Sequence, residues 1–159
     1  MNASLISIAP QYVEAILAGN KTVELRRRRP HMGPGHRLFL YATTPTKQIE
    51  GTVIVRGIEV RTVGGLWRQI SRDAALARTS FLSYFDKCES AVAIHLAEPQ
   101  PLAYPLTLQE IRRGSPLFHP PRTWISFNAL PLPLQRRLTR ALAETVRDSC
   151  KMLRASVKP

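Results

Sequence analysis

The sequence predicts an α+β fold in which a small, mostly antiparallel β-barrel is flanked by helices and followed by one long amphipathic helix. Short β-branched runs alternate with turns, and the segments lack the regular strand–helix–strand order of a parallel, doubly wound sheet. In the last quarter of the chain, apolar residues recur without interruption at the spacing of an α-helix. A length of 159 residues suits one compact unit. We expect a barrel domain over residues 1–130 and a basic amphipathic helix over 131–159 packed on it.

Alternating apolar residues place the strands. We expect a helix to begin at Pro10 and to end at Gly19, since proline suits the first helical position and glycine the end. One long strand should bend at Gly51 and Gly57. The expected strands cover residues 5–8, 21–29, 37–43, 49–63 and 91–97, with 99–105 extended.

Helical spacing places the other helices at residues 66–77, 80–85, 106–113 and 133–155. Either Thr79 or Ser80 should cap the second of these. Thr107 and Glu110 have the spacing of a capping box for the third. Residues 122–127 form either a strand or a single turn.

The stretch from Lys21 to Arg29 carries the strongest signal of a site. Its alternation puts Thr22, Glu24, Arg26 and Arg28 on one face of the expected strand. An acid held among cations suggests a site for a polar, phosphorylated ligand. The alternative is a solvated edge strand whose cations discourage association between sheets.

The chain is strongly basic, with 23 Lys+Arg against 11 Asp+Glu and a net charge of +12. Such a surface attracts polyanions, and RNA or another nucleic acid is the expected partner. An anionic membrane surface is the competing partner, but no segment is apolar enough to span a bilayer. Without a recognisable secretory signal, Cys88 and Cys150 suggest thiols in a reducing cytosol, although a disulfide between them stays open, and we expect a cytoplasmic protein.

The C-terminal helix separates charge from apolar surface. Leu134, Leu138, Ala141, Thr145 and Met152 fall on the side expected to pack on the barrel. The near absence of acids in the opposite stripe favours a phosphate-binding surface over an ordinary solvated face. That stripe contains Arg136, Arg140, Arg147, Lys151 and Arg154.

The histidines show no metal-ligand spacing, and neither a metal nor a cofactor is expected. The sequence also has no glycine-rich phosphate loop and no serine nucleophile elbow.

Residues 5–26, the segment from Tyr41 to Pro45, the pair Tyr84–Phe85 and the segment from Pro120 to Trp124 together resemble the ASCH domain family. The resemblance covers roughly residues 3–128. It implies a PUA-like β-barrel with a cleft beside the first helix, in a superfamily associated with RNA binding. Nothing is implied for the helix after Pro133.

The resemblance also implies site residues, because the family's Gly-x-Lys-Thr-x-Glu region is thought to line the cleft. Here this region supplies Lys21, Thr22 and Glu24 as candidate catalytic residues. Some small ASCH proteins deacetylate N4-acetylcytidine with a lysine, a threonine three residues later and a distant glutamate. This chain has Glu24 in the threonine's place, and Asp73 is the nearest candidate for the distant acid. Other members are described as ribonucleases or as proposed regulators.

Ligand binding has further candidates. Glu24 can accept hydrogen bonds from an exocyclic amine on a base edge, and the expected ligand-binding residues beside it are Arg26, Tyr41, Thr43 and Trp124. Trp67 and Tyr84 are other possible stacking surfaces. Phosphates are expected to contact Arg27, Arg28, Arg29 and Arg122 together with the cationic stripe of the C-terminal helix.

Three functions stay open at this point. The first is binding of RNA or a nucleotide-like small molecule. The second is an enzyme, a ribonuclease or an amidohydrolase, that uses Lys21 and Glu24, although an ordinary ion pair between these residues is the simpler reading. The third is a protein-interaction adaptor. The sequence does not predict the oligomeric state.

Overall fold

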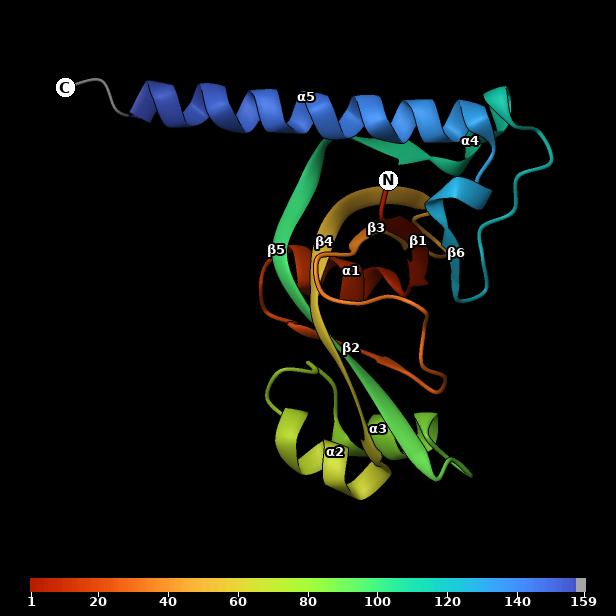
Figure 1. Ribbon diagram of the computed structural model, residues 1–159, viewed down its shortest axis with the longest axis vertical. Coiled ribbons are helices and arrows are strands. Elements are labelled where there is room, and N and C mark those ends of the chain that lie inside the picture. Colours follow the sequence, from red (N-terminus) through yellow and green to blue (C-terminus); the bar gives the residue numbers. More distant parts are fainter. Residues whose placement is uncertain (157–159) are drawn as a thin grey trace.

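A six-stranded sheet curls into a half-barrel, and the helices pack around it (Figure 1). The computed structural model describes residues 1–156, without the side chains of 149, 150 and 152–156. The strand order is β2-β5-β4-β3-β1-β6. The strands are β1 (Ala3–Ile8), β2 (Val23–Arg26), β3 (Arg37–Ala42), β4 (Gln48–Thr62), β5 (Ser90–Thr107) and β6 (Trp124–Ser126).

The helices cover the two ends and one opening of this sheet. They are α1 (Pro10–Leu17), α2 (Val63–Ile70), α3 (Arg78–Tyr84), α4 (Leu108–Gly114) and α5 (Leu132–Ser156), with a 3-10 turn η1 (Phe127–Ala129). Among the described strand pairs, β1 with β3 is parallel and the others are antiparallel. The expected α+β class and mostly antiparallel sheet are therefore confirmed.

The core has three parts, which follow the curl of the sheet. The first lies under α4 and α5 and contains Phe39, Tyr41 and Leu138. The second fills the curl beneath α1 and contains Val13, Ile16 and several residues of β1 and β3. The third lies between α2, α3 and the strands β2 and β5. The two helices α2 and α3 thus form a separate small layer, which borders the cavity described below.

Strands β4 and β5 run the length of the molecule, and their pairing shifts register near Gly51 and between Val55 and Gly57. The expected bends at Gly51 and Gly57 coincide with these irregularities. At Gly51 a Cβ atom would lie 2.5 Å from a Leu17 methyl carbon and 2.8 Å from the Gln100 carbonyl oxygen. Glycine at this position therefore lets α1 approach the sheet.

The expected strand over residues 21–29 is the main difference from the sequence interpretation. Only Val23–Arg26 are paired, and Arg27 begins a bend. The backbone N–H groups of Thr22 and Val23 both donate to the Asp73 carbonyl, so the loop after α2 holds the entry to β2. Lys21 consequently lies in the turn before the strand.

The two helices after β4 also differ from expectation. Helix α2 begins earlier, at Val63, because the Thr62 side chain accepts a hydrogen bond from Gly65, and it ends at Ile70. The residue before α3 is Ala77, without a side-chain cap, so the expected caps at Thr79 and Ser80 are wrong.

Other predictions at this level are confirmed. Thr107 and Glu110 form the expected capping box of α4. Residues 122–127 contribute β6 followed by η1. The expected strand over 91–97 and the expected extended segment over 99–105 differ from expectation in that they belong to one continuous strand, β5.

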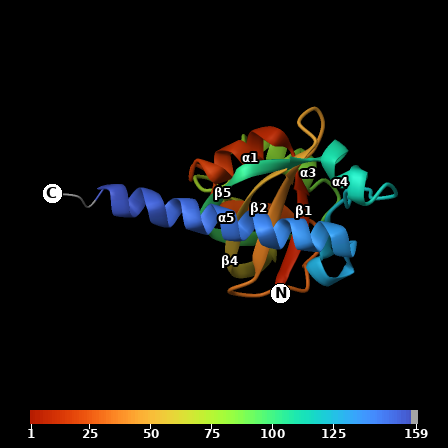
Figure 2. The same cartoon turned by 90° about the horizontal axis from the view of Figure 1, so that it is seen from above.

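Helix α5 lies across one end of the half-barrel, and Figure 2 shows that its C-terminal part extends past the sheet. Leu134, Leu138 and Thr145 are buried, as the helical pattern predicts. The Thr145 hydroxyl accepts a hydrogen bond from the backbone of Ala103 in β5. None of the described helices is long and apolar enough to cross a membrane.

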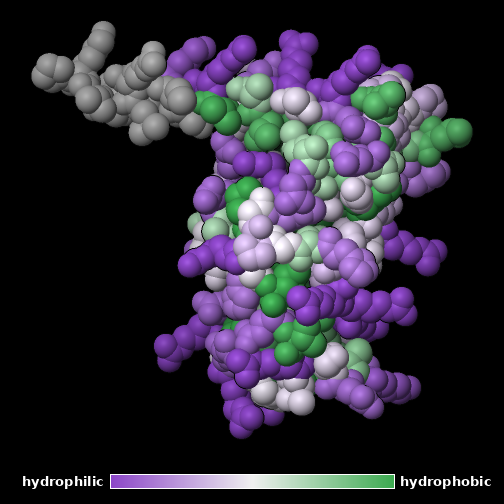
Figure 3. All heavy atoms as spheres, viewed as in Figure 1, coloured by the Kyte–Doolittle hydropathy of each residue, from purple (hydrophilic) through white to green (hydrophobic). Residues whose placement is uncertain are grey.

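Hydrophilic side chains project along the outer side of α5 (Figure 3), but acids accompany its cations. Arg140 pairs with Glu144 at 2.8 Å, and Lys151 lies 3.8 Å from Asp148. The expectation of a stripe nearly free of acids is therefore wrong for this part of the helix. Arg136 and Arg147 are exposed, and the side chain of Arg154 lies outside the described part of the structure.

The two glycines of β4 provide a test of the packing. Gly51→Ala should lower the free energy of unfolding by about 1–3 kcal/mol, because the added methyl group forces α1 and β5 apart. Gly57→Ala is the matched control, since nothing lies within 4 Å of its Cβ position. Urea unfolding of both variants makes the measurement, and equal destabilisation would contradict the packing role assigned to Gly51.

Candidate nucleic-acid interface

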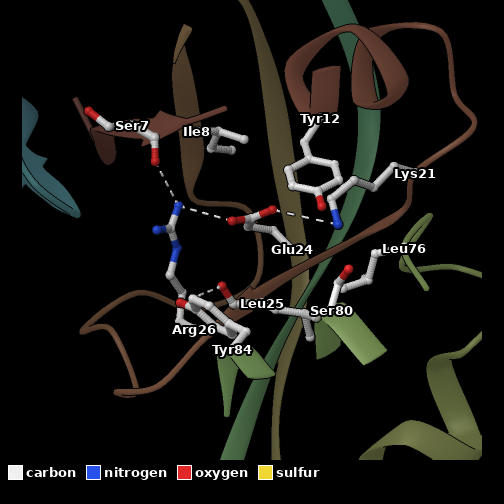
Figure 4. Close-up of a pocket in the computed structure, with 10 residues that line it drawn as sticks. All are labelled: Ser7, Ile8, Tyr12, Lys21, Glu24, Leu25, Arg26, Leu76, Ser80 and Tyr84. Carbon is white, nitrogen blue, oxygen red and sulfur yellow. Dashed lines mark hydrogen bonds and ion pairs between the residues drawn. The ribbon is translucent and has the colours of Figure 1, made fainter. Parts of the chain in front are cut away.

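A cavity of about 300 Å³ lies between α1, β2 and α3 (Figure 4). We call it the ionic cavity, because three charged side chains form one wall. Apolar side chains and hydroxyl groups supply the rest of the lining. The lining residues are Ser7, Ile8, Tyr12, Lys21, Glu24, Leu25, Arg26, Leu76, Ser80 and Tyr84.

The three charged residues form a row with the acid in the middle. One Glu24 carboxylate oxygen lies 3.0 Å from Nη2 of Arg26, and the other lies 3.7 Å from Nζ of Lys21. All three side chains are at least nine-tenths buried. Two cations and one anion leave the row with an excess positive charge, so the cavity favours a ligand rich in hydrogen-bond acceptors.

Lys21 reaches this row because it precedes the strand. On a regular strand Lys21 and Glu24 would point to opposite faces, whereas the turn at Lys21 brings both into the cavity. Its Nζ donates to the Ala74 carbonyl at 2.7 Å and lies 5.0 Å from the centre of the Tyr12 ring. Burial lowers the pKa of Lys21, Glu24 opposes this shift, and Arg26 adds a smaller lowering.

Arg26 connects the two strands on either side of the cavity. Its Nη2 donates to the Ser7 carbonyl in β1 at 3.0 Å, while its backbone belongs to β2. Its Nε is buried and has no hydrogen-bond partner within the described structure. A buried donor of this kind costs free energy unless a partner satisfies it, which makes Nε a candidate contact for a ligand.

A second concavity, of about 680 Å³, lies next to the ionic cavity. We call it the arginine groove. Its lining residues are Arg26, Arg27, Arg28, Arg29, His31, Tyr84, Thr123 and Trp124. Arg26 and Tyr84 line both concavities and form the boundary between them.

The groove keeps its positive charge. Across the described residues, no acidic side chain pairs with Arg27, Arg28 or Arg29, which are all exposed. Arg27 is held in place, because its Nε donates to the Tyr84 carbonyl at 2.7 Å and its guanidinium lies 5.0 Å from the centre of the Tyr84 ring. Guanidinium groups can pair with the phosphates of a nucleic-acid strand, and the rings of Tyr84 and Trp124 can stack on its unstacked bases.

The structure separates other residues that the sequence suggested together. Thr22 is exposed and lines a different, polar cavity with Asp73 and His95. Tyr41 is buried in the core beneath α4 and α5. Neither Thr43 nor the exposed Arg122 lines the ionic cavity or the arginine groove.

Sequence reasoning passed over several lining residues. Tyr12 was not among the predicted site residues, and Ser80 was expected only as a possible helix cap. Tyr84 was only one of several possible stacking aromatics. The available signal was the helical spacing from Ser80 to Tyr84, which puts both on one face of α3. That this face of α3 packs next to β2 can be seen only in the tertiary structure. Trp67 instead packs against Phe81.

The described residues contain no group of three or more His, Cys, Asp or Glu side chains able to hold a metal ion. Cys88 is a free thiol, and Cys150 lies outside the described side chains.

Comparison with known proteins assigns the chain to a family. The model of the ASCH domain matches residues 6–100. The chain belongs to the ASCH domain family. A Zymomonas mobilis protein named ASCH domain-containing ribonuclease is 35% identical over 124 residues, which are 77% of this chain and 83% of that protein. The resemblance seen in the sequence is thereby confirmed.

Solved structures show the same fold. The crystal structure of ASCH from Zymomonas mobilis has a TM-score of 0.79 and 31% identity, covering 87% of this chain and 94% of that one. An X-ray structure of a Pseudomonas putida protein has a TM-score of 0.53 and 18% identity, covering 88% and 98%, and it supports the fold alone. The PUA-like architecture expected for an ASCH domain is confirmed.

The buried amine of this ASCH domain predicts a pH-dependent stability. Burial puts the pKa of Lys21 below its ordinary value of 10.5. Below the lowered pKa the folded protein bears the full cost of the buried charge. Between the lowered pKa and pH 10.5, the Lys21 amine is more protonated in the unfolded chain than in the folded protein, so the free energy of unfolding rises with pH. The unfolding free energy of the wild type minus that of Lys21→Met should therefore increase from neutral pH toward pH 10.5.

Denaturant unfolding at several pH values measures this difference. The subtraction cancels the tyrosines, including Tyr84, whose pKa is raised by burial. Lys47→Met, at an exposed lysine, is the control and should follow the wild type. A Lys21→Met curve parallel to the wild type would show that the amine does not titrate as burial requires.

Proposed function

We propose that this ASCH domain binds single-stranded RNA, with one base in the ionic cavity and the adjoining phosphates in the arginine groove. The observation that carries the proposal is the junction of the two concavities at Arg26 and Tyr84. A largely apolar cavity with one wall of buried charged groups, beside an exposed cationic groove, matches a base and its backbone. About 300 Å³ is at the small end of the range for ligand sites, which suits a single base.

The chemistry of the groove supports RNA over a free acidic protein partner. Three unpaired arginines in sequence can contact successive phosphates. Tyr84 and Trp124 supply faces on which splayed bases can stack. The name of the Zymomonas mobilis relative, a ribonuclease, agrees with an RNA ligand.

Salt dependence tests the groove. In the triple variant Arg27→Ala/Arg28→Ala/Arg29→Ala, the slope of log K against log salt should become shallower by about 2, since each single-strand phosphate contact contributes about −0.7. Fluorescence anisotropy of a labelled 12-nucleotide RNA between 50 and 200 mM salt gives the slope.

The control removes the same charge from α5, which lies at the end of the molecule opposite α2 and α3 in Figure 1. Arg136→Ala/Arg140→Ala/Arg147→Ala should change the slope less, because Arg140 is already paired with Glu144. A loss confined to the α5 variant would overturn the groove and would favour the helical stripe as the phosphate surface.

RNA cleavage is a second candidate function, which the name of the 35% identical relative favours. In the ionic cavity burial lowers the pKa of Lys21, which is the direction a general base requires, and the neutral amine can take a proton from a 2′-hydroxyl. Arg26 is placed to neutralise charge on an attacked phosphate. Glu24 stands where the acetylcytidine amidohydrolases have their threonine, and the adjacent Thr22 lies outside the cavity, so their lysine–threonine pair has no counterpart in it.

Lys21→Arg tests cleavage separately from binding. The substitution keeps a cation but removes the base, so cleavage of labelled RNA should fall by about 10²–10⁴-fold while anisotropy still reports binding. Wild-type cleavage should rise with pH through the lowered pKa of Lys21, because only the neutral amine accepts a proton. Arg136→Ala, purified identically, controls for contaminating nuclease. Equal cleavage by wild type and Lys21→Arg would exclude this role.

A further inference from the structure

We propose that the ionic cavity selects uracil, because Lys21, Glu24 and Arg26 present a donor, an acceptor and a donor in one row. The inference rests on the proposed RNA binding and names the base. It concerns the edge of the base that enters the cavity, whereas the phosphates outside carry no sequence information.

The order of the row follows from the contacts. Glu24 lies between the two cations, with one oxygen toward Arg26 at 3.0 Å and the other toward Lys21 at 3.7 Å (Figure 4). A lysine ammonium and an arginine guanidinium only donate hydrogen bonds, and a carboxylate only accepts them. Among the described cavity residues, these three are the charged side chains.

Each member keeps capacity for a ligand. The Lys21 ammonium has three hydrogens, one of which goes to the Ala74 carbonyl. The Glu24 carboxylate has about four acceptor sites. Arg26 is only 9% exposed, and its buried Nε has no partner, so a ligand acceptor at this end would satisfy it. An unpartnered, buried donor at this end of the row supports the placing of a ligand acceptor beside Arg26.

Among the four RNA bases, uracil matches the row completely. Its pairing edge presents a carbonyl oxygen, a ring N–H and a second carbonyl oxygen. The two oxygens face Lys21 and Arg26, and the N–H donates to Glu24. This arrangement also places two acceptors against the excess positive charge of the row.

The other bases leave a mismatch. Cytosine has one donor followed by two acceptors, so it can satisfy Glu24 and Arg26 but leaves the Lys21 amine unmatched. Guanine has two adjacent donors, and one of them would face a cation. Adenine offers one donor and one acceptor. A buried unmatched polar group typically costs more than a hydrogen bond contributes, which makes such a row discriminating.

The arrangement also changes the role expected of Glu24. The sequence suggested an exocyclic amine as its partner. With a cation on each side of the carboxylate, a ring N–H flanked by two carbonyl groups fits better. Ile8, Leu25 and Leu76 supply apolar surface for the faces of such a ring.

Binding of fluorescein-labelled 12-nucleotide homopolymers tests the inference with the wild-type protein. U12 should bind at least tenfold more tightly than C12 or A12 at one salt concentration. A U12 strand built from N3-methyluridine, which lacks the ring N–H, should lose that advantage. Strand integrity is checked on a denaturing gel, so that cleavage does not imitate weak binding.

The outcomes separate the two proposals. No binding of any homopolymer at low salt would remove the proposed function and this inference together. Equal binding of U12, C12 and A12, tightest binding of C12, or full binding of the methylated strand would overturn the choice of uracil and leave RNA binding in place.

Two variants locate the selectivity. Glu24→Gln should bring U12 and C12 to within threefold of each other, because the amide can donate as well as accept. Arg27→Ala should weaken the binding of both strands and keep the tenfold ratio, because Arg27 lines the arginine groove but not the ionic cavity.

Competition by UMP but not by CMP against labelled U12 would show that the base edge suffices. A tenfold U12 preference that survives in Glu24→Gln would overturn the role of the row.

Discussion

The arrangement of this protein's candidate site depends on one buried ionic row, Lys21–Glu24–Arg26. Both cations also make hydrogen bonds to other parts of the chain. Lys21 donates to the Ala74 carbonyl in the loop after α2, and Arg26 donates to the Ser7 carbonyl in β1. The row therefore joins three parts of the chain that are distant in sequence. Removing Glu24 alone would leave two buried cations without a counter-charge, a loss that is typically severe.

The open curl of the sheet explains why such a row is present. Strands β2 and β6 are the two edges, and the Arg26 side chain reaches the Ser7 carbonyl where a closed barrel would have a further backbone partner. The ionic cavity, which we propose as the site of a base, lies at the same opening. The Arg26 side chain bridges this gap and keeps one buried donor without a partner among the described residues. Under the proposed function, the same side chain would contribute to both stability and recognition.

The distribution of charge gives the molecule two different basic surfaces. In the arginine groove, successive arginines come from a bend and have no acidic partners among the described residues. On α5 the helical period brings acids beside the cations, as in Arg140 with Glu144. A net charge of +12 therefore says less about the interface than the local pairing does.

Local sequence rules determined much of this protein. Proline and glycine positions set the limits of α1, Thr107 and Glu110 set the start of α4, and the helical period identified the buried side of α5. The ordered motifs were enough to identify the ASCH fold. The tertiary structure alone decided that the strand at residue 23 starts after Lys21, because the Asp73 carbonyl comes from a loop fifty residues away. It also decided that Tyr84 and not Tyr41 lines the ionic cavity, since the side chains at a cavity depend on which elements pack together.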